Sequence, residues 1–250
     1  MFGLIAVLAH VEPTVIDPKI DGVAREALVA APSAKTAEPP PVVFMFHGHG
    51  GSARRCVSRF HVEKQWPEAV VVYPDGLPID QLAPGLPVTR GQGWALACTE
   101  ANRDVKFYDA LRRRILRDYH ADPKRVYAIG FSNGGMFVYT LWTLRAKEFA
   151  GFCPSGAALA SPDMKLTVPL PCFATLSRND PNVPSTYQQQ GFDAIRAVDH
   201  SNIEGAPYGE HGTAFGGARP VVLWTYDGGH EFPFEAFPSL IKFFKSAKPD

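Results

Sequence analysis

The sequence lacks an excess of either charge. Its 250 residues include 25 Lys and Arg and 25 Asp and Glu, so the formal net charge is zero. A nucleic-acid-binding protein normally carries a basic excess, and we therefore expect no nucleic-acid partner. Every apolar run is shorter than the roughly 18 residues that span a bilayer, which argues against an integral membrane protein. The sequence has neither a dinucleotide-binding fingerprint nor a phosphate-loop motif, so no cofactor is expected.

Cysteine is scarce, and the N-terminus lacks a clear targeting pattern. Four cysteines allow three pairings if oxidised, and the sequence does not select one: Cys56, Cys98, Cys153 and Cys172. Residues 2–9 are apolar over the length of a signal-peptide core, but no Lys or Arg precedes them. We interpret residues 1–19 as an N-terminal segment, either the remnant of a secretory signal or a first strand. A secreted or periplasmic location is favoured slightly over a cytoplasmic one.

Buried strands alternate with helical patterns along the rest of the chain. Hydrophobic residues make up 46% of the sequence, enough for a large core, and residues 20–250 are expected to form one domain. Continuous apolar runs predict strands buried on both faces at residues 42–46, 69–73, 125–130, 170–176 and 220–226. Helical patterns occur at residues 105–119, 136–144 and 239–244. This alternation predicts an α/β fold with a mostly parallel sheet and helices on both faces.

Two long segments rich in glycine and proline fit neither pattern. They cover residues 74–103 and 199–219. We expect both to be loops, and loops of this length are usually functional or disordered.

The pattern Gly-x-Ser-x-Gly occurs at residues 130–134, between a predicted strand and a predicted helix. In this context it is typical of a nucleophile elbow, a turn so tight that its flanking residues must be small. Gly130 and Gly134 meet that need, and Gly135 extends it. We therefore predict that Ser132 is a catalytic nucleophile, with a passive serine in a glycine-rich turn as the alternative.

A serine nucleophile needs a base and an orienting carboxylate, which in this topology follow in the order acid, then histidine. His230 comes directly after the last predicted strand and is the predicted base, whereas His200 and His211 lie in a long loop. Asp180 follows the fourth predicted strand and is the predicted acid, with Asp227 as its main rival.

Acyl transfer also requires donors for a developing oxyanion. The backbone N–H of Asn133, directly after the nucleophile, is one candidate. The second is the N–H of His49 in the loop after the first buried strand, where glycines let amides approach a ligand. His47 and His49 also suggest a metal pair, but no cysteine or acidic cluster completes a site, so no metal is expected.

These motifs together resemble the α/β-hydrolase fold, and more narrowly the secreted esterases grouped with feruloyl esterases and polyhydroxybutyrate depolymerases. The resemblance covers roughly residues 20–245. The segments that carry it are VVFMFHGHGG at 42–51, AVVVYPDGLP at 69–78, Gly93-Trp94, DVKFYDAL at 104–111, DPKRVYAIGFSNGGMFVY at 122–139 and GGHEFP at 228–233.

The resemblance implies a triad of Ser132, Asp180 and His230, an oxyanion hole at the His-Gly loop, and Trp94 near the mouth of the site. Trp94, Phe131 and Phe232 are the candidate substrate-binding residues, Phe232 standing where many relatives carry tryptophan. The span 149–168 is too short for a large lid domain, so we expect an open site. The expected substrate is an ester of a carbohydrate or of a hydroxyalkanoate. It is either a small molecule or part of a polysaccharide or polyester.

Two other functions stay open at the level of sequence. Prolyl-oligopeptidase-type serine peptidases share the elbow and the order of acid and base, although the chain has no propeller-like domain. A hydrolase-fold protein without activity, acting only in binding, would also carry the motifs. The oligomeric state is not predicted.

Overall fold

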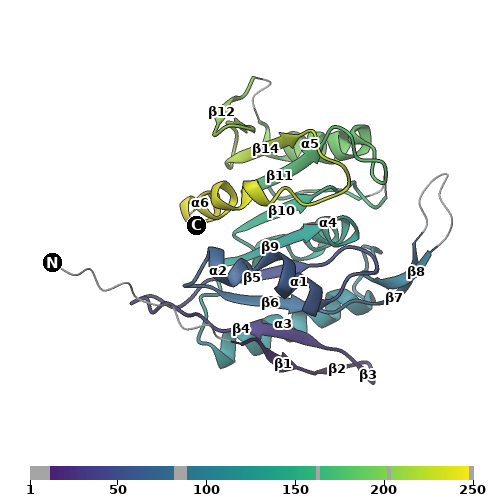
Figure 1. Ribbon diagram of the computed structural model, residues 1–250, viewed down its shortest axis with the longest axis vertical. Coiled ribbons are helices and arrows are strands. Elements are labelled where there is room, and N and C mark those ends of the chain that lie inside the picture. Colours follow the sequence, from purple (N-terminus) through teal and green to yellow (C-terminus); the bar gives the residue numbers. More distant parts are fainter. Residues whose placement is uncertain (1–11, 82–88, 162–163, 202–203, 248–250) are drawn as a thin grey trace.

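The computed structural model describes residues 12–81, 89–161, 164–201 and 204–247 (Figure 1). Its main sheet has ten strands in the order β1-β4-β6-β5-β9-β10-β11-β14-β13-β12. The bounds of these strands are Thr14–Ile16 (β1), Ala27–Ala30 (β4), Val42–Phe46 (β5), Val70–Pro74 (β6), Val126–Phe131 (β9), Gly151–Ser155 (β10), Cys172–Ser177 (β11), Ala206–Tyr208 (β12), Gly212–Phe215 (β13) and Val221–Tyr226 (β14). Two hairpins pair separately, β2 (Lys19–Ile20) with β3 (Val23–Ala24) and β7 (Leu77–Gln81) with β8 (Thr89–Gly93).

The centre of the sheet is parallel. Strands β6, β5, β9, β10, β11 and β14 run in one direction, whereas β1, β4, β13 and β12 extend the sheet by antiparallel pairing. Because the carboxyl ends of parallel strands meet at one edge, the segments after β5, β9, β11 and β14 lie along the same side. All five predicted strands are present, and the predicted α/β class is confirmed.

Helices cover both faces of the sheet. One face carries α1 (Ala53–Phe60), α2 (Val62–Gln65) and α6 (Phe237–Ser246), which pack in one buried cluster. The opposite face carries α3 (Arg103–Asp118), α4 (Asn133–Arg145) and α5 (Ser185–Asp199) in a second cluster. Short 3-10 turns occur at Ala146–Glu148 and Phe234–Ala236. Residues on a fully buried strand alternate between the two clusters, which explains the continuous apolar runs.

Three features differ from the sequence expectations. The segments at 74–103 and 199–219 contain the hairpins β7–β8 and β12–β13 rather than loops alone, and residues 82–88 and 202–203 lie outside the described residues. These short strands are rich in glycine, proline and polar residues, so they do not form the continuous apolar runs that predict a buried strand. Strand β1 joins the sheet before the boundary expected at residue 20. The apolar stretch at residues 2–9 lies outside the described residues.

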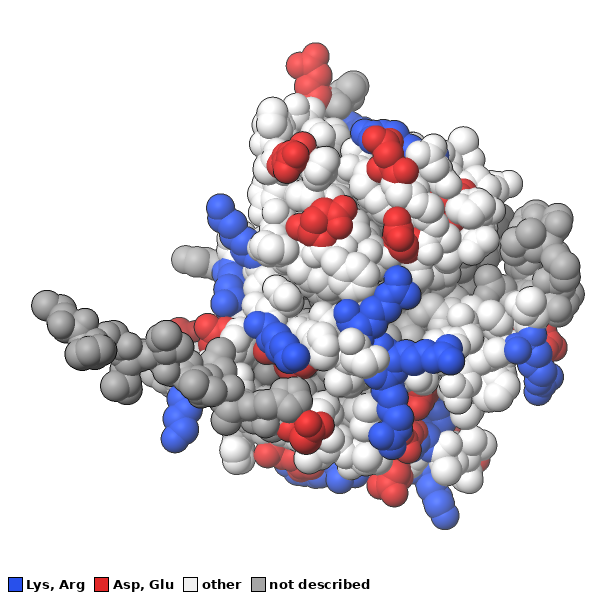
Figure 2. Space-filling view, in the orientation of Figure 1, with Lys and Arg blue, Asp and Glu red and all other residues white. Residues whose placement is uncertain are grey.

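The cysteines and the surface charges add two further observations. All four cysteines are free, and Cys153 and Cys172 on neighbouring strands face opposite clusters. On the face shown in Figure 2, Lys and Arg gather over α1 while Asp and Glu lie above and below them, so neither sign covers the face. None of the helices in the described ranges combines the length and apolarity that a membrane crossing requires.

Candidate active site

Ser132 occupies a strained turn between strand β9 and helix α4. Its backbone has φ 56° and ψ −123°, a combination that a residue with a side chain adopts only when its surroundings enforce it. Its N–H donates to the Ser155 carbonyl oxygen at 2.9 Å, which ties the turn to strand β10. The side chain is 5% exposed. The strand–turn–helix context predicted for the Gly-x-Ser-x-Gly motif is therefore present.

Three glycines make this turn possible. A Cβ added to Gly130 would lie 2.8 Å from the Gly135 nitrogen, and one on Gly134 would lie 2.6 Å from the His47 carbonyl oxygen. A Cβ on Gly135 would meet the Ala157 methyl group at 2.6 Å. Real Cβ atoms do not approach other atoms this closely, so the strand, the helix and the loop after β5 can pack only around glycine.

The structure brings Ser132, His230 and Asp180 into one hydrogen-bonded chain. His230 follows β14, and its Nε2 lies 2.8 Å from Ser132 Oγ while its Nδ1 lies 2.7 Å from Asp180 Oδ2. An ionised carboxylate only accepts hydrogen bonds, so Nδ1 carries the proton and Nε2 accepts from the serine hydroxyl. This is the arrangement in which a histidine can remove the serine proton.

Asp180 is held as an ionised carboxylate. Its side chain is fully buried, and Oδ1 accepts from the Asn182 and Val183 amides at 2.8 and 2.9 Å. Burial raises the pKa of Asp180, but the hydrogen bonds from His230 and from these two amides more than offset it, so the net pKa lies below its usual range. The acid can therefore orient the imidazole across the neutral pH range.

The loop after β5 passes against the nucleophile. A Cβ on Gly48 would lie 3.3 Å from the Ser132 Cβ. The His47 ring is buried and bridges two loops, because its Nδ1 donates to the Gly48 carbonyl oxygen at 2.7 Å and its Nε2 accepts from the Gly76 amide at 2.9 Å. Burial lowers the pKa of His47, so the ring stays neutral. The assignment of the Asn133 and His49 amides as oxyanion donors stays a prediction.

Helix α4 begins at Asn133, directly after the nucleophile. The first amides of a helix have no acceptor within it and carry a partial positive charge, so they favour an anion beside Ser132. The Asn133 side chain is engaged elsewhere. Its Oδ1 accepts from the Trp94 amide at 2.7 Å, and its Nδ2 donates to the Trp94 carbonyl oxygen at 3.3 Å.

The three aromatic candidates occupy different positions. Trp94 is 1% exposed, its indole N–H donates to the His47 carbonyl oxygen at 2.8 Å, and its ring packs on Phe137, so it lies in the core and not, as expected, at the mouth of the site. Phe232 is also 1% exposed and packs among Phe60 and other aromatic rings. Both rings fill core space. Phe131 is half-buried, with its ring centroid 4.9 Å from that of His230, and is the one of the three beside the triad.

The rival acid and the two histidines not chosen as the base lie away from the hydrogen-bonded triad. Asp227 is 77% exposed and pairs with Arg178 at 2.9 Å. His200 directly follows helix α5 in a left-handed conformation, and both His200 and His211 are exposed. No group of three His, Cys, Asp or Glu side chains within the described ranges is placed to hold a metal ion.

Two polar residues that the sequence reasoning missed hold the acid and the base in place. Gln188 on α5 is 3% exposed and donates to Asp180. Ser177 ends β11, and its hydroxyl donates to the Gly228 carbonyl oxygen in the histidine loop. A sequence signal existed for one of them, because Gln188 lies on the apolar stripe of its helix with Phe192 and Ile195.

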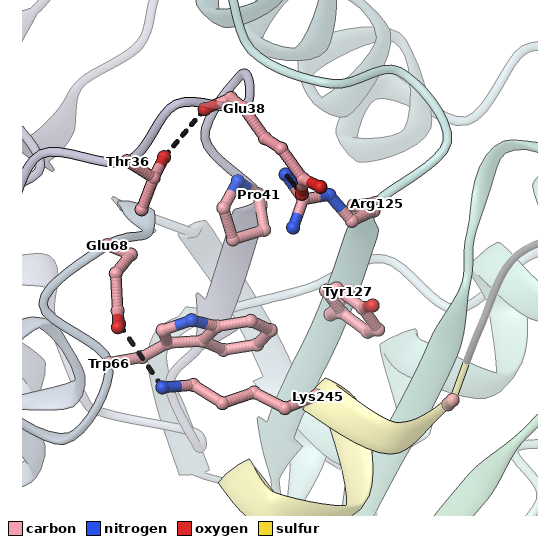
Figure 3. Close-up of a pocket in the computed structure, with 9 residues that line it drawn as sticks. Thr36, Glu38, Pro41, Trp66, Glu68, Arg125, Tyr127 and Lys245 are labelled. Atoms are coloured by element: carbon pink, nitrogen blue, oxygen red, sulfur yellow. Dashed lines mark hydrogen bonds and ion pairs between the residues drawn. The ribbon is translucent and has the colours of Figure 1, made fainter.

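A cavity of about 420 Å³ lies at the opposite edge of the sheet (Figure 3). Pro41 and Arg125 precede strands β5 and β9, and Lys245 comes from α6. The charged groups on its rim are paired, Lys245 with Glu68 at 3.2 Å and Arg125 with Glu38 at 3.3 Å. None of its lining residues belongs to the triad, so this cavity is separate from the candidate active site.

The chain is similar in sequence to known esterases. No protein-family model matches the chain. A probable feruloyl esterase C from Aspergillus niger is 26% identical over 222 residues, covering 83% of this chain and 76% of the relative. A bifunctional acetylxylan esterase/xylanase from Neocallimastix patriciarum is 29% identical over 173 residues, covering 68% of this chain. The match spans only 23% of that longer relative.

Solved structures show the same fold at low identity. An acetyl xylan esterase from Aspergillus awamori superposes with a TM-score of 0.70 at 12% identity, over 93% of this chain and 99% of that one. A ferulic acid esterase gives 0.65 at 15% identity, over 94% and 96%. The chain therefore has the α/β-hydrolase fold, and its sequence is similar to those of feruloyl and acetylxylan esterases.

Proposed function

We propose that the chain hydrolyses carboxylic esters through an acyl-enzyme on Ser132. The observation that carries the proposal is the hydrogen-bonded chain from Ser132 Oγ through His230 to the buried Asp180, with distances of 2.8 and 2.7 Å. The strained conformation of Ser132 supports it, because such strain persists where it positions a reacting group.

In the first step, Ser132 Oγ attacks the ester carbonyl carbon while His230 Nε2 takes the hydroxyl proton. Asp180 holds the ring with Nδ1–H directed at Oδ2 and stabilises the imidazolium that forms. The carbonyl oxygen becomes an oxyanion, for which we assign the Asn133 and His49 amides as donors. Collapse of this intermediate breaks the bond to the alcohol oxygen, and His230 returns the proton to the leaving alcohol.

In the second step, water takes the place of the alcohol. His230 removes a proton from the water as it attacks the acyl carbon, and the same donors stabilise the second oxyanion. Breaking the bond to Ser132 Oγ releases the carboxylic acid, and His230 returns the proton to the serine. Every proton transfer in both steps therefore goes through His230.

The substrate class we propose is an ester attached to a carbohydrate, such as a feruloyl or acetyl group. The relatives named as feruloyl and acetylxylan esterases support this class. A hydroxyalkanoate ester is the alternative. We also propose that the protein is secreted. Strand β1 and the elements that follow it would form a single catalytic domain.

Turnover of p-nitrophenyl acetate and methyl ferulate by the wild type and by Ser132→Ala tests the proposal. We expect both esters to be cleaved and the variant to lose activity by about 10⁴-fold or more. Cleavage of the acetate alone would keep the mechanism and redirect the search to acetylated sugars or hydroxyalkanoates.

Two further measurements separate the rival functions. A fluorophosphonate probe should label the wild type and not Ser132→Ala; absence of labelling in folded wild-type protein would support the inactive binding protein. A matched amide substrate cleaved as fast as its ester would instead support a peptidase.

A further inference from the structure

Gln188 is a buried polar side chain with every hydrogen-bonding group engaged. It is 3% exposed and lies on helix α5, eight residues after Asp180. Its Nε2 donates to Asp180 Oδ2 at 3.1 Å and to the Val183 carbonyl oxygen at 2.6 Å. Its Oε1 accepts from the Ser177 amide at 3.2 Å. One side chain thus joins the end of β11, the acid and the loop after the acid.

The partners of Gln188 fix which end of the amide faces the acid. The Ser177 N–H is a donor and requires the oxygen end. The Val183 carbonyl oxygen is an acceptor and requires the nitrogen end. The flipped amide would place two donors together at Ser177 and two acceptors together at Val183, so the observed orientation is the stable one. An N–H is therefore permanently directed at Asp180 Oδ2.

The same oxygen, Oδ2, accepts from His230 Nδ1 at 2.7 Å. The second oxygen, Oδ1, is occupied by the Asn182 and Val183 amides. The carboxylate therefore cannot rotate without breaking several hydrogen bonds, and its basicity is moderated by a neutral donor on the atom that binds the imidazole.

We infer that Gln188 is a positioning residue for the acid–base pair, which holds Asp180 Oδ2 against His230 Nδ1 and sets how strongly the carboxylate attracts the imidazole proton. This inference rests on the proposed function. Gln188 touches Asp180 and not the reacting atoms, so it acts through the acid. The titratable groups that face Asp180 are His230 and Tyr226, which lie after and at the end of β14.

The test is Gln188→Glu, which keeps the shape of the side chain and the acceptor for Ser177 but replaces the donor to Asp180 by an acidic group. Two carboxyl groups at this separation raise each other's pKa, and once the new side chain ionises, its negative charge beside Asp180 favours the imidazolium. We expect kcat to fall about tenfold, with KM within about twofold, because a charged hydrogen bond is lost at a residue that does not contact substrate. The acid limb of the pH profile of kcat/KM should move by about one unit to higher pH.

The matched control is Gln189→Glu, the same substitution one position along the helix. Gln189 is partly exposed and donates to Asp193 at 2.9 Å instead of to the acid. We expect its pH profile to superimpose on that of the wild type. A Gln188→Glu profile that also superimposes, apart from its height, would overturn the inference, because a purely structural role would lower the amount of active enzyme without moving the limb.

A second readout does not depend on turnover. The proton in the hydrogen bond between His230 Nδ1 and Asp180 Oδ2 should give a downfield NMR resonance, which we expect to shift in Gln188→Glu and to stay unmoved in Gln189→Glu. An unmoved resonance in both overturns the inference even if the chain proves not to hydrolyse esters. If Gln188→Glu does not fold, Gln188→Met fills the same volume, and an unchanged kcat in that variant would also overturn the inference.

Discussion

The nucleophile and the acid–base pair are positioned by different means. Ser132 is placed by backbone packing, since the glycines around it let β9, α4 and the loop after β5 approach to contact distance. Asp180 and His230 are placed by hydrogen bonds of polar side chains: Gln188 on α5 holds the acid, and Ser177 at the end of β11 holds the histidine loop. The first arrangement is rigid and tolerates no added atom. The second depends on individual polar groups, each of which can be removed without breaking the sheet.

The largest expected effect is on the acid itself. Asp180→Asn keeps the size of the side chain but removes the negative charge that holds His230 Nδ1 protonated. The amide can donate to Nδ1, which leaves Nε2 protonated and unable to accept from Ser132. We expect kcat/KM for p-nitrophenyl acetate to fall about 10⁴-fold at neutral pH. Activity within tenfold of the wild type would show that Asp180 is not the orienting acid, and Asp227→Asn should be close to wild type in the same assay.

The next effect is on stability at the elbow. In Gly134→Ala the new methyl group would lie 2.6 Å from the His47 carbonyl oxygen, so backbone must move. We expect the free energy of unfolding to fall by about 3 kcal/mol or more, measured by urea denaturation. Gly229→Ala in the histidine loop is the control, because a Cβ there meets nothing within 4 Å. If both variants lost the same free energy of unfolding, the elbow would be no more tightly packed than the hydrogen-bonded histidine loop.

A smaller effect is expected where the acid loop meets the histidine loop. The Ser177 hydroxyl donates to the Gly228 carbonyl oxygen and accepts from the Asn179 amide at 3.3 Å. Ser177→Ala removes the hydrogen-bond partner of both groups, so His230 is held less firmly. We expect kcat to fall roughly tenfold and the free energy of unfolding to fall by about 1–2 kcal/mol. Arg178→Ala, which removes the exposed ion pair to Asp227, should cost less than about 1 kcal/mol and leave kcat near the wild type. The reverse order would show that the exposed pair holds the loop.

The same contrast explains what could be predicted from the sequence. The elbow can be predicted because its glycines and its strand–helix context are close together in the sequence. The five buried strands can be predicted because each is a continuous apolar run. His230 and Asp180 were found from their places after strands, since the carboxyl ends of parallel strands meet at one edge. These inferences all use features that lie within a few residues of one another.

What could not be predicted depends on contacts between distant segments. Gln188 matters because helix α5 packs behind Asp180, and a glutamine alone does not reveal that partner. Trp94 lies in a glycine-rich segment, for which an exposed side chain is the usual expectation. In the structure it follows the hairpin β7–β8, its amide donates to the Asn133 side chain, and its ring is buried in the core. The short strands of the two hairpins are held by backbone pairing and contain too few apolar residues to form continuous buried runs.

The smallest expected effect concerns the pH dependence of stability. The pKa of Asp180 is lowered in the folded protein, so its ionised form stabilises the fold above the unfolded value near 3.8. This contribution is lost as pH falls below about 4 and through the folded pKa. Removing the carboxylate in Asp180→Asn should therefore flatten the acid side of the stability curve, whatever the variant's stability at neutral pH. Thermal unfolding of both proteins between pH 6 and pH 3 measures this difference. Parallel curves would mean that the carboxylate is no better accommodated folded than unfolded, and that the hydrogen bonds of the acid loop position Asp180 without stabilising its charge.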